Sequence, residues 1–379
     1  MLLSLTNAPR DYAWGSASLL AELEGRSPSG APEAEVWFGD HPGDPADIDG
    51  DGTLDQVTGG TLPYLLKLLA AAQPLSIQVH PTIEQAQQGW AAESGKGLDD
   101  PTRNYRDDNH KPELIVALSE TFQSLSGLRP VVETLSLLDA LGDSAGVSEL
   151  RAHLTGDADA LRDTLSWLLS GTVQRQVDDI IASVAAAAAA TERADAGEWD
   201  ATIQAIAGVA RTYPGDPGVV VALLMNHVVL RRGEGLFLRA GLLHAYLEGL
   251  GVEIMAASDN VLRGGLTPKR IDVAELLSIV DSVPSEVPVL RPASDGAITS
   301  YPVPVADFAL DRVTLTGEPV VRAVTGPTMV LATAGDVAVE TESGTVRTVP
   351  VGTAAFVSAD EPELRLSGVG EAFIAAPGR

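Results

Sequence analysis

The sequence changes character twice, and this change constrains the fold more than any other feature. From about Pro130 to Ala210, leucines recur at helical spacing, and the Ala-rich run from Ile180 to Ala194 strongly favours a helix. On both sides of this block, short apolar segments alternate with Gly and Pro, as in strands joined by turns. A chain can leave a β domain from a surface loop, fold an insertion and return to the same domain. The pattern therefore predicts a mainly β protein with an α-helical insertion.

Breakers in the sequence mark the limits of these units. The helical block ends at Tyr-Pro-Gly-Asp-Pro-Gly (213–218), and the segment Pro284–Pro292 is typical of a linker before a second all-β unit. Val219–Leu230 is compatible with a strand or a helix, and Gly249-Leu250-Gly251 predicts a turn between two strands. We therefore expect a discontinuous β domain (residues 1–128 and 215–285), a helical insertion domain (129–214) and a C-terminal β-sandwich domain (286–379).

The chain is strongly acidic and has no cysteine. Its 379 residues include 52 acidic and 25 basic side chains, for a formal net charge of −27. Such a surface repels phosphate backbones and anionic lipids, so we expect neither nucleic acid nor a membrane as a partner. The lack of cysteine excludes disulfides and thiolate ligands and fits a reducing cytoplasm. We find no signal peptide and no apolar stretch of the roughly 18 to 20 residues that span a membrane, and expect a cytoplasmic location.

Two polar side chains interrupt the apolar, strand-like segment Leu75–Pro81. Gln78 and His80 are two residues apart, and alternate residues of a strand project from the same face. They are either a polar pair satisfied by nearby backbone at a strand end or the first part of a metal site. Because the chain has no cysteine, such a site would need nitrogen and oxygen ligands.

A second polar group precedes the strongly strand-like segment Leu114–Leu118. Lys111 and Glu113 share one face of an extended chain, and Glu113 stands at the edge of the apolar segment. The two residues are either an ordinary salt bridge at a solvated strand end, or Glu113 supplies a carboxylate to a metal site. His110 falls on the opposite face, so we rank it below Glu113 as a ligand.

Three further features follow the helical block. A lone histidine in strand-like sequence, such as His244, is more often a satisfied core residue, but the three candidate ligands above lack a fourth partner. Glu253 interrupts an apolar strand and is either an outward charge or an inward functional carboxylate. The loop 258–270 combines three cations with two adjacent glycines, which suits phosphate recognition, although a mobile surface loop has the same composition.

Four motifs in this order resemble the type I mannose-6-phosphate isomerase (phosphomannose isomerase) family. They are Ser-Ile-Gln-Val-His-Pro (76–81), Asn-His-Lys-Pro-Glu (109–113), His-Ala-Tyr (244–246) with Glu253, and Ser-Asp-Asn-Val (258–261) with Arg-Gly-Gly-Leu-Thr-Pro-Lys (263–269). The detailed resemblance covers roughly residues 10–120 and 215–275. It implies a cupin-type jelly-roll catalytic domain, a helical insertion and a second, C-terminal jelly-roll-like β domain.

The resemblance also implies a cofactor and a reaction. One zinc ion per chain would be held by Gln78, His80, Glu113 and His244. The substrate would be a sugar phosphate, and the reaction would interconvert D-mannose 6-phosphate and D-fructose 6-phosphate through a cis-enediol. The direction of flux, toward glycolysis or toward GDP-mannose, is left open. Many relatives act as monomers, so we expect a monomer.

Residues that match the family's motifs are expected to act on the substrate. Glu253 and Lys111 are the candidate proton shuttles, the lysine if burial lowers its pKa. Arg263 is expected to act in catalysis, and the roles of phosphate binding and of assistance to ring opening stay undivided between Arg263 and Lys269. The expected substrate-binding residues are Lys269, Asp259, Asn260 and Tyr246.

Two other functions are compatible with a cupin metal site. An iron-dependent cupin dioxygenase would bind oxygen at open metal positions, but a glutamine ligand and a cationic loop fit it less well. A sugar-binding cupin without catalysis is the second alternative. The presence of Lys111, Glu253 and Arg263 beside a complete ligand set argues against it.

Overall fold

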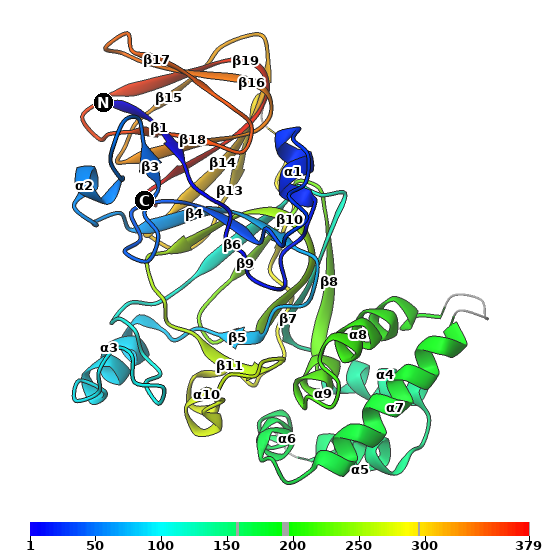
Figure 1. The fold of residues 1–379 in the computed structure, drawn as a ribbon. Helices are drawn as coiled ribbons and strands as arrows, with labels where there is room; N and C mark the ends of the chain where they lie inside the picture. The colour runs from blue at the N-terminus through cyan, green and yellow to red at the C-terminus, as the bar shows by residue number, and fades with distance from the viewer. Residues whose placement is uncertain (157–158, 192–196, 295, 379) are drawn as a thin grey trace.

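The computed structural model describes residues 1–156, 159–191, 197–294 and 296–378. Two large antiparallel sheets dominate it, and a lobe of helices lies to one side of them (Figure 1). The C-terminal strands form the sheet at the top of Figure 1, and the helical lobe lies at the lower right. The expected fold class, mainly β with a helical insertion and a second β unit, is confirmed.

The first sheet is organised around β10 (His244–Ala256), which pairs with four strands. β4 (Tyr64–Ala71) and β6 (Glu113–Ala117) pair with its second half, and β5 (Ile77–Val79) and β7 (Thr121–Leu128) pair with its first half. Because these strands precede the helical block and β10 follows it, the sheet joins the two sequence segments that the block separates. The sheet also contains β2 (Glu35–Phe38), β8 (Met225–Arg231), β9 (Gly235–Leu238), β11 (Leu262–Gly265) and β12 (Val289–Leu290).

Strand β10 runs without a break through two glycines, so the predicted turn at Gly249-Leu250-Gly251 is wrong. Gly249 has a φ of 132°, a conformation that favours glycine, and a Cβ there would lie 2.7 Å from the Phe122 ring. A Cβ on Gly251 would lie 2.7 Å from the side chain of Ile115. These glycines allow neighbouring side chains to approach the backbone of β10, instead of reversing the chain.

Five helices form the lobe that the leucine spacing predicted. Their buried apolar side chains belong to one core that also contains Ile77 and Val79 of β5, so the insertion and that strand share a core. The Ala-rich helix α7 is described to Thr191, and the last residues of the predicted run, 192–194, lie outside the described residues. The helices are α4 (Val131–Leu141), α5 (Ala145–Leu154), α6 (Ala160–Leu169), α7 (Gln174–Thr191) and α8 (Asp200–Thr212).

The remaining helices are short. The ambiguous segment 219–230 contains both structures, because α9 (Gly218–Leu223) leads directly into β8. Thr82 caps α3 (Ile83–Ala92), and Asp272 caps α10 (Val273–Ile279), each by accepting a backbone N–H of the first turn. Within the described residues no helix combines the length and apolarity needed to cross a membrane. Two further short helices are α1 (Leu19–Glu24) and α2 (Asp55–Thr58).

The second sheet contains the C-terminal strands and also the N-terminal strand. β1 (Leu2–Thr6) pairs with β18 (Ala354–Val357) from Leu2 opposite Val357 to Leu5 opposite Ala354. The first residues of the chain therefore lie in the same sheet as the last, and the domain boundaries expected from the sequence stay a prediction. The other strands are β3 (Asp47–Ile48), β13 (Ile298–Tyr301), β14 (Ala309–Thr316), β15 (Val320–Ala323), β16 (Thr328–Thr341), β17 (Val346–Val349) and β19 (Glu363–Ala376).

Tyr64 of β4 joins the two sheets. Its ring is buried, and its hydroxyl lies 2.9 Å from the carbonyl oxygen of Pro327 and 3.0 Å from that of Ala375. The ring belongs to an apolar core that also contains Phe38 of the first sheet and Phe373 of the second. Both apolar packing and a buried hydrogen bond thus hold the first sheet against the second.

Replacing Tyr64 with Phe tests this junction. The Y64F variant keeps the ring but removes the one hydroxyl proton that these two carbonyls share, so the free energy of unfolding should fall by about 1–3 kcal/mol. Urea denaturation followed by circular dichroism measures the change. Val321→Ala, at a half-exposed position on β15, should change the free energy by less than about 0.5 kcal/mol. Equal unfolding midpoints for Y64F and wild type would contradict the role of the hydroxyl.

Candidate active site

Strand pairing brings together predicted ligands from distant parts of the sequence. His244, the first residue of β10, lies opposite Gln78 on β5, and Gln78 also lies opposite Arg263 on β11. Glu113 is the first residue of β6, which pairs with β10 on its other edge. His244, Gln78 and Arg263 therefore lie side by side on three paired strands, which brings two predicted ligands next to a predicted catalytic cation.

The side chains of His80, Glu113 and His244 converge on one buried point. One ligand atom from each residue lies within 4.8 Å of the other two, and among the described residues this is the one group of three that could hold a metal ion. Nε2 of His80 lies 3.3 Å from one oxygen of Glu113, and Nε2 of His244 lies 3.4 Å from the other. All three residues are buried.

Backbone carbonyls orient both imidazole rings. Nδ1 of His80 lies 2.6 Å from the carbonyl oxygen of Asn260, and Nδ1 of His244 lies 3.0 Å from that of Leu242. A neutral histidine that donates from Nδ1 presents a lone pair at Nε2. Nε2 of His80 is buried and has no hydrogen-bond partner among the described residues. Both rings thus direct a ligating nitrogen toward Glu113, with the outer hydrogen bond that metal-bound histidines usually make.

The charges of the site also suit a cation. Burial lowers the pKa of His80 to about 4, so the ring is neutral near pH 7. Burial alone would raise the pKa of Glu113, but the ammonium of Lys111, 3.0 Å away, and His80 outweigh it and hold that pKa well below its ordinary value. Two imidazoles and a carboxylate form a donor set typical of zinc.

Gln78 completes the candidate ligand set. Its side chain lines the same cavity as Glu113 and His244. Its amide nitrogen donates to Ser76 Oγ at 3.2 Å, and its amide oxygen accepts no hydrogen bond from a described residue. The four predicted ligands are thus brought to one site, and the donor set fits a divalent metal ion.

A second buried charge cluster lies beside the ligands. Nζ of Lys67 lies 3.2 Å from one carboxylate oxygen of Glu253 and 3.9 Å from one carboxylate oxygen of Glu35. Tyr246 donates its hydroxyl to the other oxygen of Glu253 at 2.9 Å, and the Trp37 indole donates to the other oxygen of Glu35 at 2.7 Å. Lys67 and both glutamates are buried, and all three line the cavity. Glu253 is therefore the inward carboxylate that the sequence left as one of two alternatives.

This cluster holds one carboxyl group with a raised pKa. Burial raises the pKa of Glu253, although the nearby ammonium of Lys67 opposes the shift. Burial by itself would lower the pKa of Lys67. The negative charges of Glu35 and Glu253 outweigh the effect of burial and raise that pKa. Lys67 is thus held as a cation, whereas Glu253 has the raised pKa that is common for carboxyl groups at functional sites.

Sequence analysis did not predict Lys67 or Glu35 as functional residues. A signal for Lys67 was present, because it is the single charged residue in the apolar run 63–72. Glu35 carried no comparable signal, since its role depends on β2 lying next to β4, where Trp37 pairs with Lys67.

The ligands and this charge cluster line one cavity of about 380 Å³. Lys111 and Tyr246, both predicted from the sequence, line it together with Arg263 and Lys269. Three aromatic rings also line it, and they come from two parts of the chain, Tyr12 with Trp14 and Tyr213. A polar floor with a candidate metal site, cationic walls and aromatic rings is typical of a site for a small polar anion.

Three cations in this cavity or next to it lack acidic partners. Arg263 and Lys269 line both this cavity and an adjacent one of about 640 Å³, which Arg106 also lines. None of the three forms a salt bridge with a described carboxylate. The pKa of Lys269 is lowered first by the charge of Arg263 and then by burial and by Arg106. The pKa of Arg263 is lowered first by burial and then by Arg106. Uncompensated cations in so acidic a chain form a local site for an anion.

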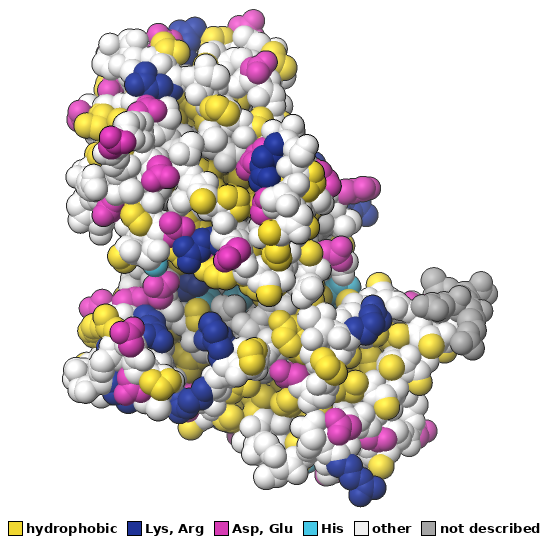
Figure 2. All heavy atoms as spheres, in the orientation of Figure 1, with side chains coloured by type: hydrophobic (Ala, Val, Ile, Leu, Met, Phe, Trp, Pro, Cys, Tyr) yellow, Lys and Arg dark blue, Asp and Glu magenta, His cyan; other side chains and the backbone are white. Residues whose placement is uncertain are grey.

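The surface around this region agrees with that assignment. Figure 2 shows several Lys and Arg side chains around the hollowed region near α3 and α10, with acidic side chains among them and over the rest of this face. Arg106 was not predicted from the sequence, where it stands in a polar loop between other charged residues. Its proximity to Arg263 is a product of tertiary structure.

Three residues considered from the sequence do not line the cavity. A carboxylate oxygen of Asp259 lies 3.1 Å from Nε2 of His41. This hydrogen bond is the main cause that lowers the pKa of Asp259, and burial opposes it. The buried Asn260 side chain bonds to the loop around residues 106–109, and its carbonyl oxygen orients His80. Nε2 of His110 lies 2.9 Å from a carboxylate oxygen of Asp307, away from the ligands. This position agrees with the expectation that Glu113 is the better ligand candidate. Direct substrate contacts of Asp259 and Asn260 stay a prediction.

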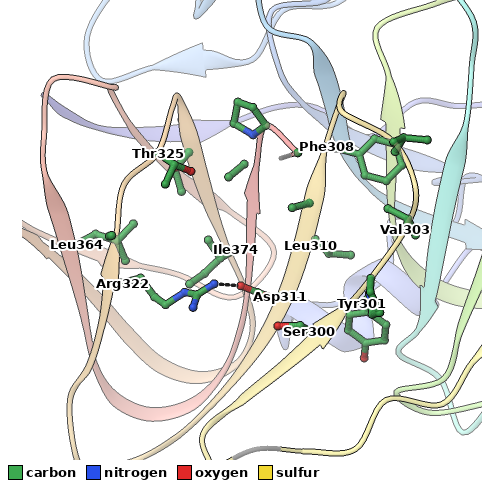
Figure 3. Close-up of a pocket in the computed structure, with 18 residues that line it drawn as sticks. Ser300, Tyr301, Val303, Phe308, Leu310, Asp311, Arg322, Thr325, Leu364 and Ile374 are labelled. Carbon is green, nitrogen blue, oxygen red and sulfur yellow. Dashed lines mark hydrogen bonds and ion pairs between the residues drawn. The ribbon is translucent and has the colours of Figure 1, made fainter.

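The second sheet contains another cavity, of about 470 Å³, that differs in chemistry. Most of its lining residues are apolar, among them Val303, Phe308 and Leu310 (Figure 3). Its two charged side chains, Arg322 and Asp311, form an ion pair with each other. This cavity therefore offers neither converging ligands nor an unpaired charge among its lining residues, and the candidate active site is the cavity of the first sheet.

Comparisons with known proteins agree with this site. Residues 2–131 match the family described as phosphomannose isomerase type I, catalytic domain. The mannose-6-phosphate isomerase of Escherichia coli K12 is 36% identical over 390 residues, which cover 97% of each chain. The human mannose-6-phosphate isomerase is 32% identical over 361 residues, which cover 83% of this chain and 82% of the human protein.

Solved structures extend the similarity to the whole fold. A mutant phosphomannose isomerase from Salmonella typhimurium superposes with a TM-score of 0.89 at 32% identity, with both chains covered completely. A mannose 6-phosphate isomerase bound with zinc and yttrium superposes with a TM-score of 0.88 at 33% identity, again with complete coverage of both chains. The arrangement of two sheets and a helical insertion is thus the fold of these proteins.

The buried charges make a prediction for stability. Lys67→Met removes the cation but preserves most of the side-chain volume, so Glu35 and Glu253 would be left buried without it. The free energy of unfolding should fall by about 3–5 kcal/mol. Arg291→Met breaks the exposed pair with Glu234 and should cost less than about 1 kcal/mol. Urea denaturation of both variants checks this difference, and equal losses would show that burial does not govern the two pairs.

Proposed function

Because the chain belongs to the type I phosphomannose isomerase family, we propose that it is a zinc-dependent aldose-ketose isomerase that interconverts D-mannose 6-phosphate and D-fructose 6-phosphate. The observation that carries the proposal is the buried group of His80, Glu113 and His244, which faces a cavity with unpaired cations at one end. The ligand group suits a metal and the cations suit a phosphate. An isomerase of sugar phosphates needs both in one cavity.

Gln78, His80, Glu113 and His244 would hold one zinc ion per chain. The two imidazoles, the carboxylate and the amide oxygen supply four nitrogen and oxygen ligands. Bound zinc supplies Lewis-acid polarisation of a sugar oxygen. Lys111 keeps the carboxylate of Glu113 charged and ready to bind the ion.

The isomerisation moves a proton between C2 and C1 of the open sugar, and we assign this transfer to Glu253. Its carboxyl lines the cavity, and its raised pKa brings it closer to the working pH of a general base. Lys67 and Tyr246 hold its two oxygens, so the group has a defined orientation. Lys111 is already paired with Glu113 and is better suited to stabilising negative charge at the sugar oxygens during a cis-enediol step.

The phosphate would bind among Arg263, Lys269 and Arg106. Arginine binds phosphate oxygens in a bidentate manner, and lysine contributes a point charge. The negative field of the whole chain opposes an anionic substrate, so these three side chains carry the local attraction.

A coupled assay with mannose 6-phosphate tests the proposed reaction. The enzyme should convert the substrate, lose activity after treatment with a chelator and regain it when zinc is added back. His244→Ala should lower zinc content and reduce activity more than about 100-fold, because loss of even an outer partner of a metal ligand costs about 10–100-fold. His153→Ala on α5 is the control and should retain zinc and activity, since His153 stacks on Trp167 outside the site. Chelator-resistant activity, or a fully active H244A, would refute the metal assignment.

Glu253→Gln separates proton transfer from metal binding. The amide keeps the shape but cannot accept the proton, so kcat should fall by about 100- to 10,000-fold while zinc content stays at one per chain. The measurements are steady-state kinetics with mannose 6-phosphate and metal analysis of the purified variant. An E253Q enzyme with kcat close to wild type would assign the proton transfer to another group, with Lys111 the next to test.

A further inference from the structure

The segment that ends the helical insertion also holds the loop that carries two of the cations. Asp216 lies just before α9, and one of its carboxylate oxygens accepts the backbone N–H of Gly218 at 2.7 Å and that of Leu266 at 3.1 Å. The other oxygen accepts the backbone N–H of Thr267 at 3.2 Å. A single carboxylate therefore binds two successive amides of the loop 263–269 across a sequence separation of 50 residues.

The backbone of this loop adopts conformations that need such support. Leu266 has a φ of 56°, the one positive φ of a non-glycine residue in the described part of the chain. Its neighbour Gly265 has a φ of 134°, and a Cβ there would lie 2.4 Å from Cα of Gly218. A left-handed conformation at a leucine persists only when the surroundings hold it in place. The Asp216 carboxylate and the burial of the Leu266 side chain are the contacts that do so.

Arg263 and Lys269 lie on either side of this strained turn. Neither side chain makes a hydrogen bond or a salt bridge to a described residue, so their positions depend on the backbone that carries them. Pro268 and the hydroxyl of Thr267, which accepts the N–H of Lys269 at 3.1 Å, stiffen the far end of the loop. The near end is paired with β5 at Gln78, and the turn between these two points is bound by Asp216.

The same exit segment reaches the cavity at a second point. Tyr213 lines the cavity and donates its hydroxyl to the carbonyl oxygen of Pro74 at 2.8 Å. The insertion therefore contacts both the segment before β5 and the loop after β11. Its last residues form part of the frame of the active site.

We propose that Asp216 is a positioning residue for phosphate recognition, and that its carboxylate holds the loop 263–269 in the conformation that directs Arg263 and Lys269 into the cavity. The inference rests on the proposed function, because it takes the phosphate of the sugar as the ligand of these cations. Asp216 itself does not line the cavity, so it acts through the loop rather than on the substrate.

The test compares Asp216→Ala, Asp216→Asn and the wild type. Asp143→Asn, at an exposed aspartate between α4 and α5, is the matched control. For each protein we would measure kcat and KM with mannose 6-phosphate, the inhibition constant and the direct binding of inorganic phosphate, the zinc content, and unfolding in urea. Inorganic phosphate carries the anionic group of the substrate without the sugar, so its binding reports on phosphate recognition apart from catalysis.

In D216A, KM and the dissociation constant of inorganic phosphate should rise together by about tenfold, which corresponds to about 1.4 kcal/mol. The value of kcat should change less than about twofold and zinc content should stay at the wild-type level, because the ligands and Glu253 are untouched. D216N keeps one accepting oxygen and should lie between D216A and wild type. D143N should behave as wild type.

Two results would overturn the inference. One is unchanged KM and phosphate affinity in folded D216A and D216N. The other is loss of zinc and of kcat in proportion to KM, which would indicate a general structural role. Direct binding of phosphate needs no isomerase activity, so a wild-type protein that fails to convert mannose 6-phosphate would defeat the proposed function while the binding measurements still decide the role of Asp216.

Discussion

A buried carboxylate, that of Glu113, sets requirements that much of the surrounding structure meets. An ionised group without water is costly unless charges and hydrogen-bonding partners surround it. Lys111 supplies the positive charge, and two imidazoles present their Nε2 atoms to its oxygens. Those imidazoles are fixed in turn by the backbone carbonyls of Asn260 and Leu242. The same arrangement that makes the buried carboxylate tolerable also suits it to bind a metal ion.

The cavity separates three kinds of electrostatic environment within a short distance. Around Glu113, the ammonium of Lys111 and the two imidazole rings favour a charged carboxylate. Around Glu253, burial raises the carboxyl pKa despite an adjacent lysine. At the far end, cations without acidic partners await an anion. The metal binding, proton transfer and phosphate recognition that we propose need different environments, and one sheet with a strained loop at its edge contains all three.

Local patterns in the sequence predicted much of this arrangement. Alternate residues of a strand share a face, which predicted that Gln78 and His80 lie on one face and that His110 and Glu113 lie on opposite faces. In the structure His110 lies away from the ligands, next to Asp307. The leucine spacing predicted the helical lobe. The expected turn at Gly249-Leu250-Gly251 was wrong, because glycine in a strand can serve close packing as well as a reversal, and the local sequence does not distinguish the two.

The sequence by itself determined the residue types available to the site, the faces from which they project and the resemblance to a known family. Only the tertiary structure decided the roles of Lys67, Glu35, Arg106 and Asp216, because their partners lie on other strands or loops. A salt bridge, a cluster of cations or a carboxylate that binds a loop depends on distances through space. Those distances arise when β10 returns from the helical insertion and pairs with β4, β5 and β6. The chemistry of this protein is therefore encoded in its motifs, but it is assembled by the pairing of one long strand.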